Sequence, residues 1–189
     1  MDCAAPQAGI SPQRSAYLSD TFREKGAPVS ALEFRGAMAK FTTAVSVIAT
    51  DGPAGMAGLT CSAVCSVSDT PATLAICVHT RSAANNVIKA NGVLSVNCLH
   101  VDQMSLSQAF AGIGKLAMAE RFAMASWGVL VTGAPYCKDA LTALDCEIID
   151  ARDVATHSVF VVNVIATIAS ENQQPLIYQQ RNYATTRSL

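Results

Sequence analysis

Short strand-like segments follow one another along this chain, with only short helical patterns between them. Val45–Thr50 and Val159–Ile168 are rich in β-branched residues, and Gly, Pro, Asn or Asp lies beside most such segments. The expected strands span residues 45–50, 56–67, 73–79, 93–97, 144–148, 159–168 and 175–178. Six or seven strands without long helices between them argue against alternating β-α-β units and predict a mainly antiparallel barrel.

Three short helices are expected among these strands. Ser30 and Glu33 form a capping box, which predicts a helix from residue 30 to about residue 41. Ser82 and Asp102 are expected to cap two further helices, and a glycine follows the end of each. The fold class predicted is therefore mainly β with short helices.

The chain divides into an expected arm and one expected domain. Residues 1–29 mix proline, glycine and polar residues without a sustained hydrophobic period, which predicts an N-terminal arm. Residues 30–189 are numerous enough to bury a sizeable core without disulfide or metal staples. We therefore expect a single domain over residues 30–189.

Charged residues are scarce, at 14% of the chain against about 25% in a typical soluble domain, while 51% of the residues are hydrophobic. The 13 Lys and Arg against 14 Asp and Glu leave a net charge of −1, so nucleic acid is not an expected partner. No apolar run reaches the roughly 18 residues of a membrane helix, and no membrane association is expected. The apolar excess points to a core, a subunit interface or a cofactor site.

The seven cysteines are scattered along the chain, and no two of them form a Cys-x-x-Cys motif. Their odd number means that they cannot all be paired within one chain. Asp2 stands where a secretory signal requires basic residues, so we expect a cytoplasmic protein with reduced thiols. The spacing of Cys61 and Cys65 with the scattered histidines does not supply four zinc ligands, and no metal is expected.

Gly112–Ala117 matches the dinucleotide-binding pattern G-x-G-x-x-A. This segment follows a helical stretch, whereas the dinucleotide fingerprint follows a strand, so the match does not predict a dinucleotide site.

Small residues dominate the stretch from Gly52 to Asp69. A strand without bulky side chains lets a flat ring system such as isoalloxazine lie close to the backbone, where amides and hydroxyls reach its polar edge. The same smallness would let another part of the protein pack tightly against the strand. Composition alone does not choose between these two interpretations.

Three further polar groups each allow a functional and a structural interpretation. Ser82 with Asn85 and Lys89 could meet a phosphate at a helix N-terminus, or could belong to a capped and solvated helix. His157 precedes a very apolar strand, either as a functional imidazole or as a structural residue with satisfied hydrogen bonds. The terminal group with Arg181 could serve an anionic cofactor or complete the fold.

Several short motifs occur in order between Phe34 and Tyr183. They are Phe34-Arg35-x-Ala37-Met38, the small-residue run Gly58-Leu-Thr-Cys-Ser-Ala-Val-Cys-Ser-Val-Ser-Asp69, Ser95-Val-Asn97, Phe110-Ala-Gly112, Glu120-Arg-Phe122 with Trp127, Gly133-Ala-Pro135, and His157 at the start of a strand. Taken together, they resemble the short-chain flavin reductase family. The nearest resemblance is to the reductase components of two-component aromatic monooxygenases, such as 4-hydroxyphenylacetate 3-monooxygenase and the chlorophenol monooxygenases.

This resemblance implies an FMN-binding split β-barrel, usually a homodimer, and it assigns positions to the candidate residues. Those implied to line the isoalloxazine are Thr60, Cys61, Ser62 and Ala63, and those near the ribityl phosphate are Ser82, Asn85 and Lys89. Phe110 and Gly112 would close the pocket, His157 would lie beside the nicotinamide, and Arg181 and Tyr183 would lie near the outer parts of the cofactor. The chain has Ala155-Thr156-His157 where the family often has Gly-Asp-His.

The function implied is NADH-dependent hydride transfer from nicotinamide C4 to flavin N5, with release of the reduced flavin to a separate aromatic-hydroxylating monooxygenase. FAD is expected in preference to FMN, and NADH in preference to NADPH. Because the cofactors carry such a reaction, no acid-base dyad is required, and His157 is the expected catalytic residue. The alternatives are a flavin carrier or sensor without turnover and a flavoenzyme that oxidises an organic substrate directly, since one fold can host several functions.

Overall fold

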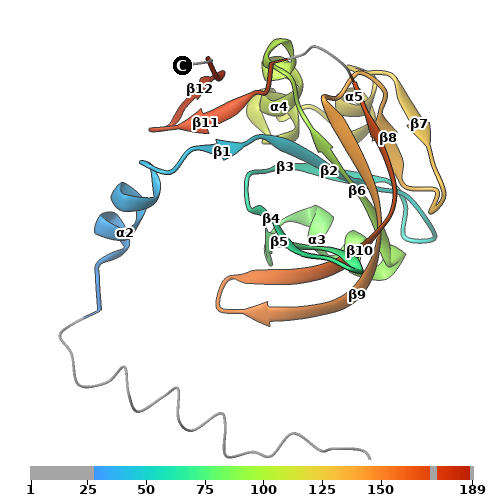
Figure 1. The fold of residues 1–189 in the computed structure, drawn as a ribbon, viewed down its shortest axis with the longest axis horizontal. Helices are drawn as coiled ribbons and strands as arrows, with labels where there is room; N and C mark the ends of the chain where they lie inside the picture. The colour runs from blue at the N-terminus through green and yellow to red at the C-terminus, as the bar shows by residue number, and fades with distance from the viewer. Residues whose placement is uncertain (1–27, 171–173, 188–189) are drawn as a thin grey trace, which may run out of the picture. The chain divides into compact units, whose positions relative to one another are not determined.

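The computed structural model describes residues 28–170 and 174–187 (Figure 1). The chain divides into two compact units, Met1–Met38 and Ala39–Leu189. In the first unit, α2 (Ala31–Met38) begins with the predicted capping box, in which the Ser30 N–H donates to Glu33 Oε2 at 2.9 Å. The helix ends before residue 41, and most of the expected arm lies outside the described residues.

Seven strands of the second unit form one antiparallel sheet, as predicted. They are β2 (Ser46–Thr50), β3 (Ala57–Cys61), β4 (Val64–Asp69), β5 (Ala72–His79), β6 (Val93–Cys98), β9 (Thr142–Val154) and β10 (His157–Ala169). Their spatial order is β3-β2-β6-β9-β10-β5-β4. The long β9–β10 hairpin forms the middle of the sheet, because β10 pairs with β9 along its length and with β5 over His157–Asn163.

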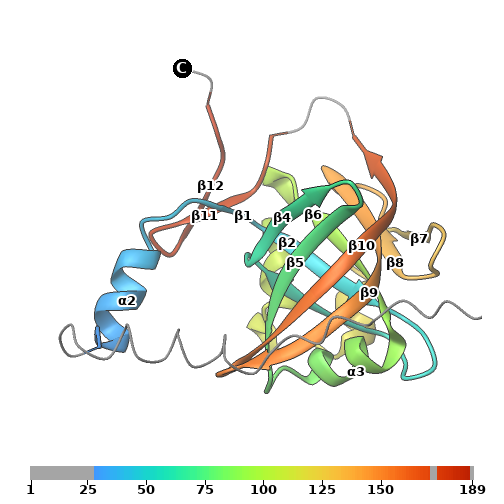
Figure 2. The ribbon, with the colours of Figure 1, turned by 60° about the horizontal axis from the view of Figure 1, so that its bottom comes forward.

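The two edge strands of this sheet are joined by only two residues, Ser62 and Ala63. A flat sheet of seven strands would be about 29 Å wide at about 4.8 Å per strand, whereas the link from residue 61 to residue 64 spans at most about 11 Å. The sheet must therefore curl until its edges approach each other (Figure 2). No ladder joins β3 to β4 in the described residues, so the barrel is split. The single strand expected over residues 56–67 is thus two strands.

The interior of the barrel is filled by aliphatic and aromatic side chains with almost no exposure, including Ile48, Ile76, Leu94 and Phe160. The helix α3 (Ala83–Asn91) adds Ala84 and Ile88 to the same core. As predicted, a glycine ends this helix, since Gly92 has a φ of 71°. As predicted, Ser82 is the N-cap residue of this helix; its carbonyl accepts the Asn85 N–H at 3.0 Å, while its hydroxyl forms no capping hydrogen bond.

A second core lies between β2 and an outer layer of short elements. This layer contains the 3₁₀ turns η1 (Val101–Gln103) and η2 (Ile113–Lys115), the helices α4 (Met104–Phe110) and α5 (Met118–Phe122), and the strands β7 (Trp127–Val129) and β8 (Pro135–Cys137). The predicted cap at Asp102 is wrong, because the His100 side chain accepts the Asp102 N–H instead. In the described part of the chain, no helix is long and apolar enough to cross a membrane.

A small third sheet is formed by β1 (Thr43–Ala44), β11 (Ile177–Gln179) and β12 (Asn182–Ala184). It connects the entry to β2 with the C-terminal segment, which Figure 1 shows lying beside each other. Hydrogen bonds from the Val45 N–H to the Leu176 carbonyl at 3.0 Å and from the Leu176 N–H to the Leu99 carbonyl at 2.9 Å extend this connection. The last expected strand is therefore part of a hairpin.

The turn of the β9–β10 hairpin holds a non-glycine residue in the left-handed region. Val154 pairs with His157, and Ala155 between them has a φ of 52°. This conformation costs an alanine about 1–3 kcal/mol, whereas glycine adopts it freely. The departure from the Gly-Asp-His pattern therefore places strain beside His157.

We predict that Ala155→Gly raises the free energy of unfolding by about 1 kcal/mol. The relief of strain exceeds the roughly 0.4–1 kcal/mol that a more flexible unfolded chain costs. Urea unfolding followed by circular dichroism measures the change. Thr156→Gly is the matched control, since Thr156 has no positive φ, and it should lower stability. An Ala155→Gly protein no more stable than the wild type would contradict the prediction.

Candidate functional site

One cavity brings together four of the residues predicted to bind cofactor. It has a volume of about 490 Å³ and lies between the end of β3, the end of α4 and the β11–β12 hairpin. Its lining residues are Val45, Thr60, Ser62, Gln108, Ala111, Ile113, Tyr178, Arg181, Asn182 and Tyr183. The volume falls within the range of about 300–1,000 Å³ that is usual for small-molecule sites. We refer to it as the hairpin cavity.

The alternation of an extended chain decides which residues at the end of β3 face this cavity. Thr60 and Ser62 line it, whereas the Cys61 side chain points the opposite way into the barrel core. Burial raises the pKa of the Cys61 thiol to about 11, and its Sγ lies 3.6 Å from the Cys77 carbonyl oxygen. Cys61 is therefore an uncharged core residue at neutral pH, while Ala63 is exposed next to the cavity wall.

Phe110 supports the cavity wall from behind. Its ring has an exposed fraction of 2% and packs at 5.1 Å from the ring of Phe122 and 5.9 Å from that of Trp127. A Cβ placed on Gly58 would lie 2.7 Å from Phe110 Cε1, which is closer than such atoms approach. The lack of a side chain at Gly58 thus allows the Phe110 ring to pack against the backbone of β3. Gly112 follows this helix with a φ of 89° and separates the lining residues Ala111 and Ile113.

The β11–β12 hairpin contributes the only charged side chain among the lining residues that the structure describes, Arg181. Its two-residue turn holds Gln180 at a φ of 49° and Arg181 at 63°, both unusual for non-glycine residues. The Tyr183 hydroxyl lies 2.9 Å from Ser107 Oγ, and its ring packs edge-on against Tyr178 at 5.3 Å. These contacts fix the hairpin over the cavity and hold Arg181 at its rim.

Sequence reasoning missed several lining residues. Gln108 lies on α4 two residues before Phe110, and Tyr178 lies on the hairpin. Neither belongs to a recognisable motif, and the cavity that they line is assembled from several segments that are distant in the chain. For Tyr178, the signal available was its nearness in sequence to Arg181 and Tyr183.

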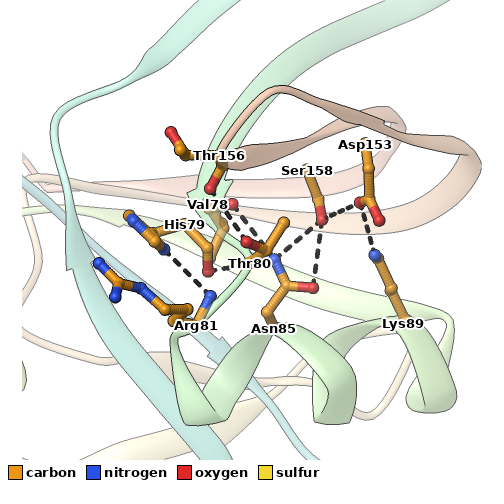
Figure 3. A network of polar contacts seen from close by, with 9 residues as sticks. All are labelled: Val78, His79, Thr80, Arg81, Asn85, Lys89, Asp153, Thr156 and Ser158. Carbon is orange, nitrogen blue, oxygen red and sulfur yellow. Dashed lines mark hydrogen bonds and ion pairs between the residues drawn. The ribbon is translucent and has the colours of Figure 1, made fainter.

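A second group of predicted residues forms a polar network at the start of α3 (Figure 3). Asn85 is buried, with an exposed fraction of 1%, and its amide nitrogen donates to the Val78 carbonyl at 3.2 Å and to Ser158 Oγ at 3.0 Å. Lys89 forms an ion pair with Asp153 at 2.8 Å. The Ser82 hydroxyl forms no capping bond. Asn85 therefore ties α3 to β5 and β10, while Ser82 and Lys89 lie nearer to solvent.

The charge of Asp153 is stabilised by this network. Hydrogen bonding from Lys89, followed by that from Ser158 at 2.5 Å, lowers the pKa of the Asp153 carboxyl below its ordinary value. A carboxyl whose pKa is lowered by folding stabilises the protein above the ordinary pKa. This contribution is lost as the pH falls through the folded value.

His157 lies opposite His79 across the β5–β10 ladder, with the two ring centroids 4.9 Å apart. The Thr156 hydroxyl lies 2.9 Å from His157 Nδ1, and the His157 side chain is exposed to solvent. His157 is one of the predicted site residues, whereas His79 belongs to none of the motifs in the sequence. The two rings together make an aromatic and polar surface at the end of these strands.

A short backbone path, which includes one hydrogen bond, connects the wall of the hairpin cavity to the strand that carries His79. Ser62 lines the cavity, and the carbonyl of the next residue, Ala63, accepts the Cys77 N–H at 3.0 Å. His79 follows Cys77 by two residues on β5, which is about 7 Å along an extended chain. The segment that forms the cavity wall is thus hydrogen-bonded to the strand that carries His79.

The chain belongs to the flavin reductase-like family, because the family model described as flavin reductase like domain matches residues 38–187. The curated protein FMN reductase (NADH) RutF from Agrobacterium fabrum is 43% identical over 159 residues, covering 84% of this chain and 90% of that protein. The family match over residues 38–187 includes the hairpin cavity, the polar network and both histidines. The predicted family is therefore confirmed.

Solved structures confirm the predicted split-barrel fold. A Haemophilus somnus protein, provisionally described as a flavin reductase, superposes with a TM-score of 0.80 at 39% identity, covering 84% of this chain and 100% of that chain. Nitrilotriacetate monooxygenase component B from Mycobacterium thermoresistibile superposes with a TM-score of 0.75 at 25% identity, covering 82% and 86%. The narrower resemblance to 4-hydroxyphenylacetate and chlorophenol systems stays a prediction.

We predict that Gly58→Ala lowers the free energy of unfolding by about 1–3 kcal/mol, because the added methyl group must displace the Phe110 ring. Urea unfolding measures the loss. Phe110→Leu leaves space at this contact, so Gly58→Ala should cost less in that background, and the difference gives the coupling energy. Equal costs in the two backgrounds would show that the ring does not limit residue 58.

Proposed function

We propose that this protein is an NADH-dependent flavin reductase that supplies diffusible reduced flavin to a separate oxygenase. The observation that carries the proposal is the family match over residues 38–187, which includes every residue of the hairpin cavity and of the histidine pair. The name of the Agrobacterium fabrum relative, FMN reductase (NADH), supports the same activity.

The residues of the hairpin cavity fit a flavin. Two tyrosines, Tyr178 and Tyr183, offer aromatic surface, and Ser62, Gln108 and Arg181 make no side-chain hydrogen bond to another described residue. Their hydroxyl, amide and guanidinium groups are therefore free for the polar edge of the ring system or for a phosphate. Thr60 can only accept a bond, because its hydroxyl donates to the Ser107 carbonyl at 2.6 Å.

The protein's part in the reaction is to bind, orient and shield. A bound flavin would supply the hydride acceptor at N5, and the nicotinamide C4 would supply the hydride. Thr60, Ser62 and Arg181 would hold the flavin, while His157 would position the nicotinamide ring against it. Reacting atoms need to approach to about 3–3.5 Å. No acid-base pair is required, which agrees with a cavity lining whose only charged residue, among those described, is Arg181.

Ser82 and Lys89 are proposed to meet the phosphate end of the flavin. Lys89 would exchange its exposed ion pair with Asp153 for the phosphate, at small cost because such pairs contribute little. Asn85 would support this end through its buried hydrogen bonds, since its amide nitrogen is already engaged by Val78, His79 and Ser158. We therefore propose that Asn85 positions the start of α3 and does not itself contact the phosphate.

FMN is the flavin that the relative's name favours, and the FAD preference expected from sequence finds no such support. We therefore propose FMN as the preferred flavin and NADH as the preferred nicotinamide.

We also propose that a separate monooxygenase receives the reduced flavin. The likeness to nitrilotriacetate monooxygenase component B supports this proposal. Which oxygenase receives the flavin, and whether its substrate is aromatic, would follow from the neighbouring genes.

A homodimer is also proposed. Large apolar side chains remain exposed on the barrel strands, among them Ile149, Ile165 and Ile168 with exposed fractions of 55%, 41% and 42%. A second copy that covers them would account for part of the scarcity of charge, because obligate interfaces resemble a core cut in half. Light scattering at micromolar concentration distinguishes a dimer from a monomer.

The activity is tested by following NADH oxidation at 340 nm with added FMN, FAD or riboflavin. We expect flavin-dependent turnover, a lower KM for FMN than for FAD, and slower reaction with NADPH. No flavin-stimulated oxidation of either nicotinamide would overturn the proposal. A yellow protein that retains flavin and ignores NADH would instead be a carrier, and anaerobic reduction by an organic substrate would indicate a direct oxidase.

We predict that His157→Ala lowers kcat/KM for NADH by about 3- to 10-fold, because a ring contact of about 1 kcal/mol is lost, while the dissociation constant for FMN stays within twofold. Stopped-flow reduction and flavin fluorescence titration measure the two quantities. His157→Phe keeps an aromatic ring and should retain most of the rate if packing is the main contact. Wild-type kinetics in His157→Ala would refute the role.

A further inference from the structure

We infer that His79 is a second nicotinamide-binding residue, whose Nε2–H donates a hydrogen bond to the carboxamide oxygen of the nicotinamide ring. This inference rests on the proposed function, since it concerns the same hydride donor. It adds a residue that the motifs do not contain, because His79 lies on β5, far in sequence from the strand start occupied by His157.

The direction of the donor follows from a hydrogen bond to the other ring nitrogen. The Arg81 backbone N–H donates to His79 Nδ1 at 3.0 Å, so Nδ1 acts as an acceptor and carries no proton. A neutral imidazole then carries its proton on Nε2. No hydrogen bond joins His79 Nε2 to any residue that the structure describes. His79 therefore has an available donor at the tip of its ring.

The main chain around His79 is held in place by the polar network of Figure 3. The His79 carbonyl accepts the Ser82 N–H at 2.9 Å and the Asn85 side-chain amide at 3.4 Å. On the other side, the N–H and hydroxyl of Thr80 both donate to the Thr156 carbonyl, at 3.0 and 3.1 Å. The ring is thus fixed before any ligand arrives, which spares the entropy of ordering it on binding.

The position of this donor suits a nicotinamide held by His157. The two rings are 4.9 Å apart and inclined at 58°, so a nicotinamide in contact with His157 would lie within reach of His79. The carboxamide oxygen is the strong neutral acceptor of nicotinamide, and a neutral N–H donor matches it. The nearby Arg81 side chain, which is exposed, offers a charged alternative that would favour the pyrophosphate instead.

Two substitutions separate the binding role from a structural one. His79→Asn keeps an acceptor near the position of Nδ1 for the Arg81 N–H and removes the donor at Nε2. His79→Gln keeps an amide donor near the position of Nε2. We expect His79→Asn to raise the KM for NADH by about 2- to 10-fold, the worth of one neutral hydrogen bond, with the KM for FMN unchanged. His79→Gln should recover most of the affinity.

Thionicotinamide adenine dinucleotide, in its reduced form, tests the carboxamide itself, because sulfur accepts hydrogen bonds more weakly than oxygen. In the wild type its KM should exceed that of NADH, and in His79→Asn the two values should converge. An unchanged ratio in His79→Asn would overturn the assignment and favour the pyrophosphate. Equal rises in the KM values for NADH and FMN in both variants would show a purely structural residue.

Direct binding keeps this test separate from the proposed activity. NADH fluorescence titration of the full chain measures affinity without turnover. Weaker binding by His79→Asn but not by His79→Gln would support the inference even if no flavin were reduced, in which case the proposed function alone would fail. Equal affinity in the wild type and His79→Asn, or no NADH binding by the wild type, would overturn the inference.

Discussion

The two-residue link between β3 and β4 is the constraint on which the remaining structure depends. Because Ser62 and Ala63 must join opposite edges of a seven-stranded sheet, the sheet curls into a split barrel and encloses a hydrophobic core. The same link sends Cys61 inward and presents Thr60 and Ser62 to the hairpin cavity. Through the bond between the Ala63 carbonyl and the Cys77 N–H, it also brings the cavity wall next to the strand that carries His79. The link that closes the barrel therefore also positions the residues of the site.

Several motifs that mark the family serve this architecture rather than chemistry. Glu120 accepts the Ala117 N–H at 2.7 Å, Arg121 donates to the Leu116 carbonyl at 2.9 Å, and the Trp127 indole donates to the Phe122 carbonyl at 2.8 Å. These bonds hold the aromatic cluster that keeps Phe110 against Gly58. The small residues of this strand are thereby explained in part by packing, which resolves at Gly58 an alternative that composition had left open.

The strands β2, β5 and β10 were predicted well, because each contains a run rich in apolar and β-branched residues, which favours an extended chain. The capping box of Ser30 and the helix stop at Gly92 were predicted for the same local reason. Ser82 was correctly predicted as an N-cap residue, whereas Asp102 was not, since several polar groups compete at a helix start and only the folded chain selects among them. The strand pairs β7–β8 and β11–β12 were not predicted as hairpins, because three-residue strands have too little pattern.

The sequence by itself determined the class of fold, the family and the residue types available for a flavin and a nicotinamide, because these depend on local periodicity and on short ordered motifs. Only the tertiary structure decided which of those residues meet. It gathered Thr60, Ser62, Arg181 and Tyr183 around one cavity, and it placed Asn85 in a buried network. It also set His79 against His157 across a ladder whose partners are 78 positions apart, from 79 to 157. Such pairings depend on strand register and barrel closure, which arise from contacts between distant segments and leave no local signal in the chain.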